Sequence, residues 1–298
     1  MIPIETAGLA RFRYRQKLRA ALRRVWAHVP GSDAWFVGDR VMDAYMCAFT
    51  PETVDPQANY EFFEILGDAS LNKSVTWYFQ DRFPQLRCAG GVRYLARLKI
   101  NTIAKDQLAR WTCALGLAPF VRWGSGSASP PSPAYPLGTH QMSVLEDVFE
   151  AMLGVTELRV DSLAGTRGPG YAAVYSLMAK LLDPTPFELT YEALWDPKTR
   201  LKELFDAQPD WRLVYTHTAC TGPSDSSADA GHGTRGFVAQ VHVHPTPGKM
   251  RGNHGGSKSK GRCIGSSPAG QTFGRRIDAE QAAAEHALAH LPRGQMNR

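Results

Sequence analysis

The chain has 298 residues, of which 43% are hydrophobic, and a formal net charge of +6. This length and composition favour two folded domains over a disordered or fibrous chain. The basic excess favours a polyanionic partner such as nucleic acid, and no apolar run is long enough to cross a membrane.

Cysteine spacing and the basic N-terminus bear on the compartment. The cysteines lie far apart, without a Cys-x-x-Cys pair, which argues against a disulfide framework or a structural zinc site and favours a reducing compartment such as the cytoplasm. The stretch from Arg11 to Arg24 carries seven basic residues and no acid, and its pattern predicts an amphipathic helix. A mitochondrial transit peptide and a phosphate-contacting first helix both fit, and the sequence leaves both open.

The first two thirds of the chain have the periodicity of helices. We expect helices over residues 9–27, 39–49, 59–79, 92–115, 142–158 and 171–182. Gly116 is expected to cap the fourth of these helices, and the Gly/Ser/Pro-rich stretch 124–136 is expected to be a surface loop. The segment 183–186, Asp-Pro-Thr-Pro, marks the expected domain boundary.

The third predicted helix carries an acidic stripe, because Glu61, Glu64 and Asp68 return to one face at about 100° per residue. Its other residues are strongly apolar, so we expect the helix to be packed and the stripe to face a cleft. These apolar residues are Phe62, Phe63, Ile65, Leu66 and Leu71. Acids confined in a cleft repel one another unless neutralised, so a hard cation is the natural counter-charge. A solvated acidic face is the alternative.

A second acidic pair lies on the helix predicted over 142–158. Asp147 and Glu150 are three residues apart and share a face, whereas Glu146 is expected to point elsewhere. The rest of this helix is apolar, which predicts that the pair also lies within packed protein.

The residues after the boundary have a different pattern. Asp196 is the predicted N-cap of a helix that has Pro197 at its first position. Strands are expected over 212–218 and 237–244, and a last helix over 278–291. The polar stretches 220–236 and 245–272 are expected to be loops. The basic residues of the second stretch are either simply solvated or contact phosphates.

Two motifs resemble those of the ribonuclease III family. Residues 59–71, with Glu-Ile-Leu-Gly-Asp-Ala at the centre, are similar to its signature helix, and Asp147 to Gly154 is similar to its second motif. Pro51 stands where the family usually has histidine. The C-terminal part resembles a double-stranded RNA-binding domain, although its basic segment is only partly kept as Arg275-Arg276 and its inter-strand loops are expanded.

The resemblance implies a site and its cofactor. Glu64, Asp68, Asp147 and Glu150 would hold Mg²⁺, with Mn²⁺ as a possible substitute. Asp68 and Glu150 would be catalytic, with Glu150 bridging two metal ions. Supporting residues would be Asn59 and Glu61. The implied RNA-binding residues are Lys198, Lys202, His232, Arg275 and Arg276.

The resemblance also implies the architecture and the function. We expect an all-helical endonuclease domain over 1–184, a linker over 185–195, and a small α-β-β-β-α double-stranded RNA-binding domain over 196–292. The implied protein is a homodimeric, Mg²⁺-dependent endoribonuclease that cleaves double-stranded RNA and has no membrane partner. Its signature helices, residues 59–71, would meet in the dimer through their apolar side. A non-catalytic RNA-binding scaffold and a silencing suppressor that acts on small duplexes are the alternatives.

Overall fold

The computed structural model describes residues 4–124, 137–221, 235–246 and 261–291. Chain contacts divide it into two units, Met1–Phe187 and Glu188–Arg298. Most of the predicted loop 124–136, His232 and most of the two polar stretches lie outside the described residues. In the described ranges, no helix combines the length and the apolar character that a membrane crossing requires.

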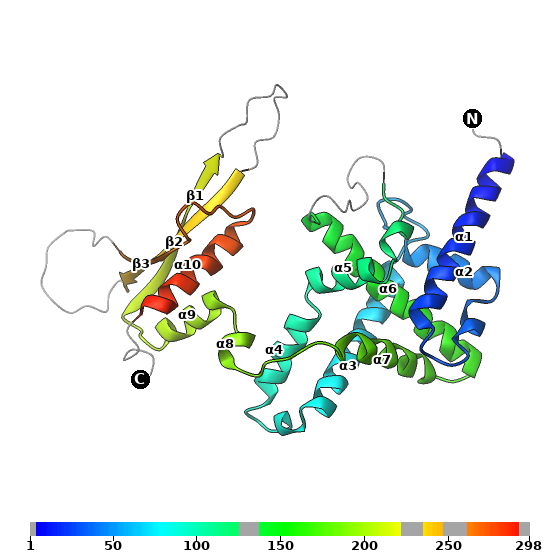
Figure 1. Ribbon diagram of the computed structural model, residues 1–298, viewed down its shortest axis with the longest axis horizontal. Coiled ribbons are helices and arrows are strands. Elements are labelled where there is room, and N and C mark those ends of the chain that lie inside the picture. The colour runs from blue at the N-terminus through cyan, green and yellow to red at the C-terminus, as the bar shows by residue number, and fades with distance from the viewer. Residues whose placement is uncertain (1–3, 125–136, 222–234, 247–260, 292–298) are drawn as a thin grey trace, which may run out of the picture. The chain divides into compact units, whose positions relative to one another are not determined.

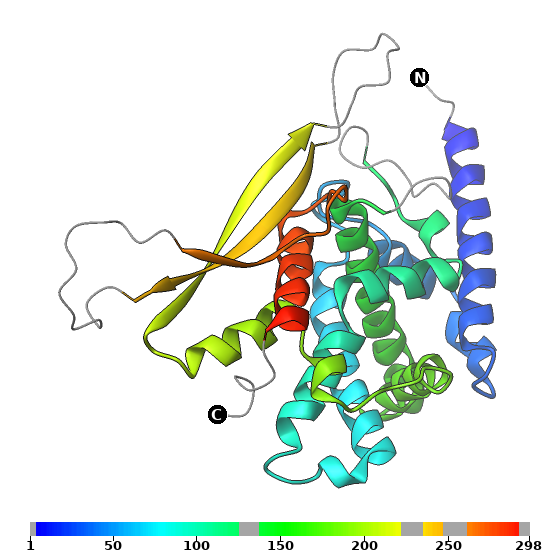
Figure 2. The ribbon, with the colours of Figure 1, turned by 60° about the vertical axis from the view of Figure 1, so that its left-hand side comes forward.

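The first unit is helical, as predicted (Figure 1). Its helices are α1 (Ile4–Trp26), α2 (Asp39–Ala48), α3 (Glu61–Arg82), α4 (Val92–Thr102), α5 (Lys105–Ala114), α6 (Thr139–Ala164) and α7 (Pro169–Leu182). Helices α3 and α6 lie side by side at the centre of this unit, and α5, α7 and α2 pack against α6 (Figures 1 and 2). The buried side of α6 includes Leu145, Phe149 and Met152. The unit is therefore built around the two acidic helices.

The single helix predicted over 92–115 is wrong, because the chain forms α4 and α5 with a break at Ile103 and Ala104. Ala104 is extended, with φ −63° and ψ 144°, and its carbonyl accepts hydrogen bonds from the amides of Gln107 and Leu108. These bonds begin a new helix. The β-branched pair Thr102-Ile103 weakens helix formation at this point. Gly116, with φ 70°, follows the end of α5 as predicted.

The second unit has the predicted α-β-β-β-α order. It contains the short α8 (Tyr191–Leu194), then α9 (Pro197–Asp206), β1 (Trp211–Thr221), β2 (Arg235–Pro245), β3 (Arg262–Ser266) and α10 (Arg276–His290). The strands pair antiparallel in the order β1-β2-β3. Helices α9 and α10 cover one face of this sheet (Figure 2). The polar stretch 245–272 was wrongly expected to be only a loop, because it contains β3.

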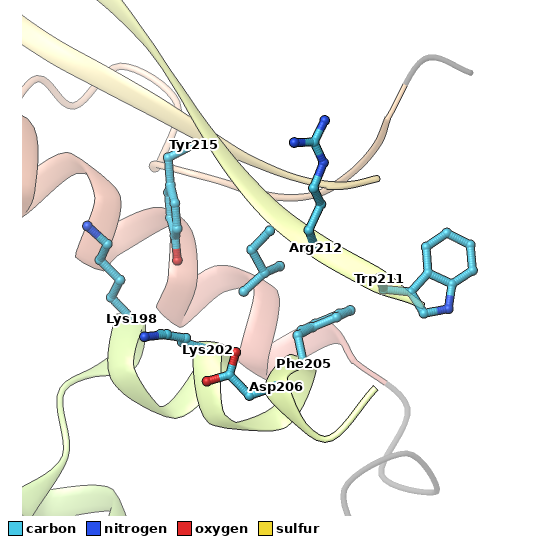
Figure 3. A pocket seen from close by; sticks show the side chains of 8 residues that line it. Lys198, Lys202, Phe205, Asp206, Trp211, Arg212 and Tyr215 are labelled. Atoms are coloured by element: carbon cyan, nitrogen blue, oxygen red, sulfur yellow. The ribbon is translucent and has the colours of Figure 1, made fainter. Parts of the chain in front are cut away.

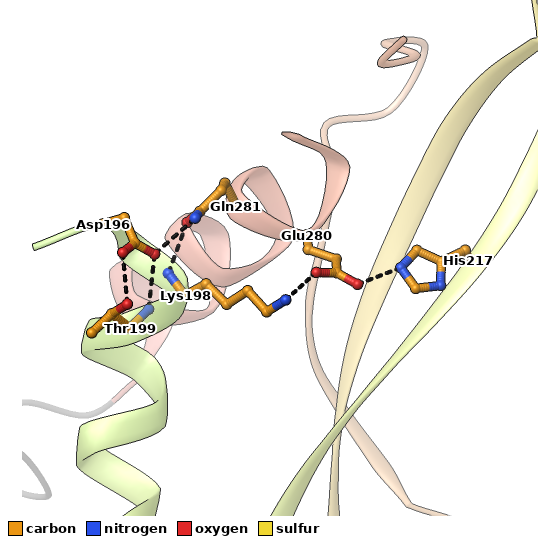
Figure 4. Close-up of polar contacts among 6 residues, drawn as sticks. All are labelled: Asp196, Lys198, Thr199, His217, Glu280 and Gln281. Carbon is orange, nitrogen blue, oxygen red and sulfur yellow. Dashed lines mark hydrogen bonds and ion pairs between the residues drawn. The ribbon is translucent and has the colours of Figure 1, made fainter. Parts of the chain in front are cut away.

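Polar contacts join the helices of the second unit (Figure 4). The Asp196 side chain accepts from the Thr199 amide at 3.0 Å, which confirms the predicted N-cap. Gln281 of α10 donates to Asp196 at 2.7 Å and accepts from the Lys198 amide at 2.9 Å. These contacts fix the start of α9 against α10. Leu201, Val241 and Ala283 belong to the small core beneath them.

Candidate active site

Glycine residues bring the two acidic helices into backbone contact. A β-carbon on Gly67 would lie 1.8 Å from the backbone oxygen of Glu150, and one on Gly154 would lie 2.1 Å from the backbone oxygen of Phe63. Real β-carbon atoms do not approach a backbone oxygen so closely, so only glycine fits at these two positions. This close approach places the predicted carboxylates of α3 beside those of α6.

Burial and mutual repulsion perturb these carboxylates. Burial, followed by repulsion from Asp68 and its acidic neighbours, raises the pKa of Glu150 to about 9, and its side chain is 8% exposed. Burial and repulsion from Asp147 raise the pKa of Glu64 to about 7. Burial also raises the pKa of Asp147. The four predicted carboxylates therefore form one electrostatically coupled cluster.

The donor set fits a hard divalent cation, because carboxylate oxygens are the ligands that Mg²⁺ prefers and a cation would relieve the repulsion. Within the described ranges, however, no three His, Cys, Asp or Glu side chains are arranged to hold a metal ion. Glu64, Asp68, Asp147 and Glu150 thus surround one helix crossing without converging on a ready-made ligand group. Mutual repulsion of like charges opposes such convergence in a protein without a bound cation.

Two hydrogen bonds orient carboxylates of the cluster. The Tyr60 hydroxyl, just before α3, donates to Asp147 Oδ2 at 2.9 Å. The Asn72 side-chain amide, one turn after Asp68, donates to Asp68 Oδ1 at 2.6 Å and accepts from Lys99 Nζ at 2.9 Å. Burial raises the pKa of Asp147, and the Tyr60 bond acts against this larger effect, so the bond favours the ionised form that binds metal.

A lysine of α5 lies at the edge of the cluster. Lys105 Nζ donates to Ser143 Oγ at 2.9 Å and forms an ion pair with Glu146. Burial lowers the pKa of Lys105, but the contact with Glu146 and the nearby Asp147 and Glu150 outweigh it, so the pKa is raised. Glu146 therefore anchors α5 to α6 and adds negative charge to the cluster.

The two supporting residues predicted from the sequence, Glu61 and Asn59, lie in different places relative to the carboxylate cluster. Glu61 is exposed and contributes to the raised pKa of Glu64, so it lies near the cluster. Asn59 donates to the backbone oxygen of Asp55 at 3.1 Å and accepts from the Glu61 amide at 3.2 Å. These recorded bonds place Asn59 at the start of α3.

Sequence reasoning missed Tyr60, Asn72, Lys99 and Lys105. Asn72 could have been found, because a residue four positions after Asp68 lies on the same helix face. The contact of Lys105 depends on the break between α4 and α5, and the contacts of Tyr60 and Lys99 depend on tertiary packing. A periodicity argument does not reveal these three.

Most predicted RNA-binding cations of the second unit already have a partner. Lys198 pairs with Glu280, which also accepts from His217 Nε2 at 2.6 Å (Figure 4). Arg275 makes two bonds of 2.8 and 2.7 Å to Asp278. The Arg276 guanidinium lies 5.4 Å from the centre of the Phe237 ring. Lys202 is exposed.

Replacing Tyr60 by phenylalanine tests its bond to Asp147. We expect the variant to fold and to bind Mg²⁺ several-fold more weakly, since the Asp147 carboxylate loses a donor that favours its ionised form. A calorimetric titration with Mg²⁺ measures this. Tyr14→Phe is the control, because its hydroxyl donates to the Phe120 carbonyl at 2.6 Å, away from the acids. Equal Mg²⁺ affinities in both variants would contradict the assignment.

Comparison with known proteins finds similar sequences for the part of the chain that contains the carboxylate cluster. Residues 61–160, from the start of α3 through most of α6, match the model of the Ribonuclease III domain. The chain is 38% identical over 182 residues to "Putative ribonuclease 3" of Frog virus 3 (isolate Goorha), covering 60% of this chain and 47% of the relative. It is 35% identical over 179 residues to the protein of the same name of Invertebrate iridescent virus 6, covering 56% and 58%.

A bacterial relative is similar over the same share of the chain. Ribonuclease 3 of Thiobacillus denitrificans is 31% identical over 163 residues, covering 53% of this chain and 64% of the relative. The chain thus spans less than two thirds of the length of each of these relatives. The matched domain contains both acidic helices and the glycines at their crossing. The segment 61–160 is therefore similar to the Ribonuclease III domain and to relatives named ribonuclease 3.

Proposed function

We propose that the protein is a metal-dependent endoribonuclease that cleaves double-stranded RNA. The observation that carries this proposal is the coupled cluster at the crossing of α3 and α6, in which the pKa of Glu150 is raised to about 9. A cluster that disfavours its own ionisation gains most from a bound cation. Its relatives named ribonuclease 3 support the choice of RNA.

The four carboxylates have distinct roles in this proposal. Glu64, Asp68, Asp147 and Glu150 hold Mg²⁺, with Mn²⁺ as a substitute, and Asp68 and Glu150 are the catalytic pair. Bound Mg²⁺ supplies an acidified water and neutralises charge on the phosphate. Tyr60 and Asn72 orient the carboxylates of Asp147 and Asp68 through their hydrogen bonds. Glu61 adds negative charge beside Glu64, and Asn59 keeps its proposed supporting role from the start of α3.

We propose that the protein acts as a homodimer through an apolar patch on α3. Phe62 and Ile65 are 66% and 74% exposed in the single chain, so they do not pack within it and are available for the dimer contact that the resemblance implies. Exposed apolar side chains that lie together mark contact surfaces. Phe62 and Ile65 lie three residues apart, on the same helix as Glu64 and Asp68, so a second copy seated there would adjoin the site.

A charge placed in this patch tests the dimer. We expect Ile65→Lys to convert dimers to monomers and to lower the rate of RNA cleavage at least tenfold. Burying the lysine charge in an apolar dimer contact would remove its water without supplying a partner, which is energetically unfavourable. Sedimentation of the variant measures its mass. Leu163→Lys on α6 is the matched control, since Leu163 is also exposed, at 49%. A dimeric Ile65→Lys variant would show that the contact lies elsewhere.

The second unit is proposed to be a double-stranded RNA-binding domain that contacts phosphates and 2′-hydroxyls with little sequence preference. Lys202 is its most available predicted cation. The other predicted cations already have partners within the domain. Lys198 pairs with Glu280, Arg275 pairs with Asp278, and Arg276 lies over the Phe237 ring. The proposed domain boundaries remain 1–184 for the endonuclease domain, 185–195 for the linker and 196–292 for the RNA-binding domain, and His232 is kept as a proposed RNA contact.

The cysteines are free thiols, which supports a cytoplasmic location.

A cleavage assay tests the function. Long duplex RNA, single-stranded RNA of the same sequence, and duplex DNA are each incubated with the protein in Mg²⁺ or in EDTA. We expect short products from duplex RNA in Mg²⁺ alone. Duplex RNA that is bound equally well in both buffers and never cut would favour the scaffold alternative. Equal cleavage of the single strand would contradict the assignment of double-stranded RNA.

A further inference from the structure

A groove in the second unit lies between α9 and β1, with a volume of about 320 Å³ (Figure 3). The β1 side carries Tyr215 and Leu213, and the α9 side carries Phe205 together with Lys198, Lys202 and Asp206. Lys198 and Lys202 lie one turn apart on α9. Aromatic rings with ammonium groups beside them suit a ligand that has both a flat ring and an anionic group.

The Tyr215 hydroxyl is the most specific feature of this groove. It is buried and makes no hydrogen bond within the described part of the chain. A buried hydroxyl without a partner destabilises the folded protein, and an acceptor atom of a bound ligand would remove that cost. Burial raises the pKa of Tyr215 to about 12, so the group stays a donor at neutral pH. In Figure 3 its oxygen points toward α9, where the lysines lie.

The two lysines differ in whether their ammonium group already has an acidic partner. Lys198 Nζ lies 5.1 Å from the centre of the Tyr215 ring and pairs with Glu280. Lys202 is exposed, and no ion pair is recorded for it among the described residues. Lys202 and the Tyr215 hydroxyl are therefore the available cation and donor for an anionic oxygen, and Asp206 beside them disfavours a polyphosphate.

We propose that this groove binds a single nucleotide, with its base against the rings of Phe205 and Tyr215 and its phosphate between Lys202 and the Tyr215 hydroxyl. Stacking of a base on an aromatic side chain contributes about 1–3 kcal/mol, whatever the base. The volume is at the lower limit of ligand pockets and is too small for a base pair. The ligand is a free mononucleotide or an unpaired nucleotide of an RNA strand. The proposal does not depend on whether the first unit cuts RNA.

Saturation-transfer NMR on the full chain in EDTA tests this proposal without cleavage. The observed probes are AMP, adenosine and a short single-stranded RNA, and inorganic phosphate, which has no carbon-bound proton, is added as a competitor of AMP. We expect AMP to bind more tightly than adenosine or phosphate. Tyr215→Phe, which removes only the hydroxyl, should weaken AMP binding about fivefold or more. Lys202→Met should do the same, whereas Lys17→Met on α1 removes one exposed charge and should have no effect.

The outcomes separate cleanly. If the RNA strand binds more tightly than AMP, and both groove variants lose this binding, the ligand is an unpaired RNA nucleotide. If the RNA strand and AMP bind equally tightly, the ligand is the free mononucleotide. AMP that fails to bind, or that binds Lys202→Met and Lys17→Met equally well, overturns the proposal. Hydrogen exchange of α10 amides checks the fold of each variant. Because Lys202 is exposed, its variant gives a result even if Tyr215→Phe unfolds.

Discussion

Glu150→Gln is expected to abolish RNA cleavage and at the same time to stabilise the metal-free protein. The carboxylate is buried among other acids, so its ionised form is disfavoured in the folded state. Glutamine keeps the size of the side chain and removes the charge. We expect a loss of at least about a thousandfold in cleavage rate, in the range found when an essential electrostatic group is removed from an active site.

The stability effect has a defined pH dependence. The folded-state pKa of Glu150, about 9, lies above its usual value of 4.5, so the stability contributed by the protonated group is fully present at acidic pH. It is lost as the pH rises from that usual value through about 9. Near pH 8 in EDTA, we expect Glu150→Gln to be more stable than wild type by about 1–3 kcal/mol, and near pH 4 to be equal to it.

Chemical denaturation at these two pH values measures the difference in free energy of unfolding. Glu188→Gln is the control, because Glu188 belongs to the second unit and no part of the site contains it. A Glu150→Gln variant that is less stable than wild type at pH 8 would show that the carboxylate is stabilised there. A Glu150→Gln variant that cleaves RNA at the wild-type rate would show that Glu150 is not part of the active site.

Gly67→Ala is expected to destabilise the first unit and to separate the two acidic helices. The added β-carbon would lie 1.8 Å from a backbone oxygen of α6, and the backbone cannot rotate away as a long side chain can. We expect a loss of about 3 kcal/mol or more, which corresponds to a fall in Tm of roughly 10 °C. Cleavage should fall with it, because the carboxylates of α3 move away from those of α6.

A second glycine serves as a matched control. Gly8 also lies within a helix, α1, but a β-carbon there meets nothing within 4 Å. Gly8→Ala should therefore raise stability by about 0.5–1 kcal/mol through the helix preference of alanine. Thermal unfolding and cleavage of both variants are compared with wild type. A Gly67→Ala variant that matches Gly8→Ala in both measurements would contradict the helix crossing.

Much of the fold was predictable from sequence because local patterns determine it. Helical periodicity indicated the acidic helices, and Asp196 with Pro197 correctly predicted the start of α9. The break between α4 and α5 was missed, since apolar residues continue across it and only the extended backbone of Ala104 reveals it. Strand β3 was missed because it follows a long polar stretch and spans only Arg262–Ser266.

The candidate site was only partly predictable, for a different reason. Motifs indicated Glu64, Asp68, Asp147 and Glu150, since a short spacing on a helix determines which residues share a face. The resemblance implied a dimer contact on the apolar side of α3, but it did not tell which apolar residues are exposed there. Ile65 is exposed and Leu71 is buried, and the two residue types do not differ in a way that predicts this. The ion pair between Lys198 and Glu280 was likewise not predictable, because the two residues are far apart in the chain and meet only through tertiary packing.

Thermal unfolding of wild type and Glu150→Gln in increasing Mg²⁺ at pH 8 tests most directly whether the carboxylate cluster holds the metal ion. A cation that binds the folded cluster must raise Tm as its concentration rises. We predict that Mg²⁺ raises the Tm of wild type until it reaches or exceeds that of the variant, while the Tm of Glu150→Gln changes little. An equal rise in both proteins would show that Mg²⁺ binds elsewhere and would contradict the account.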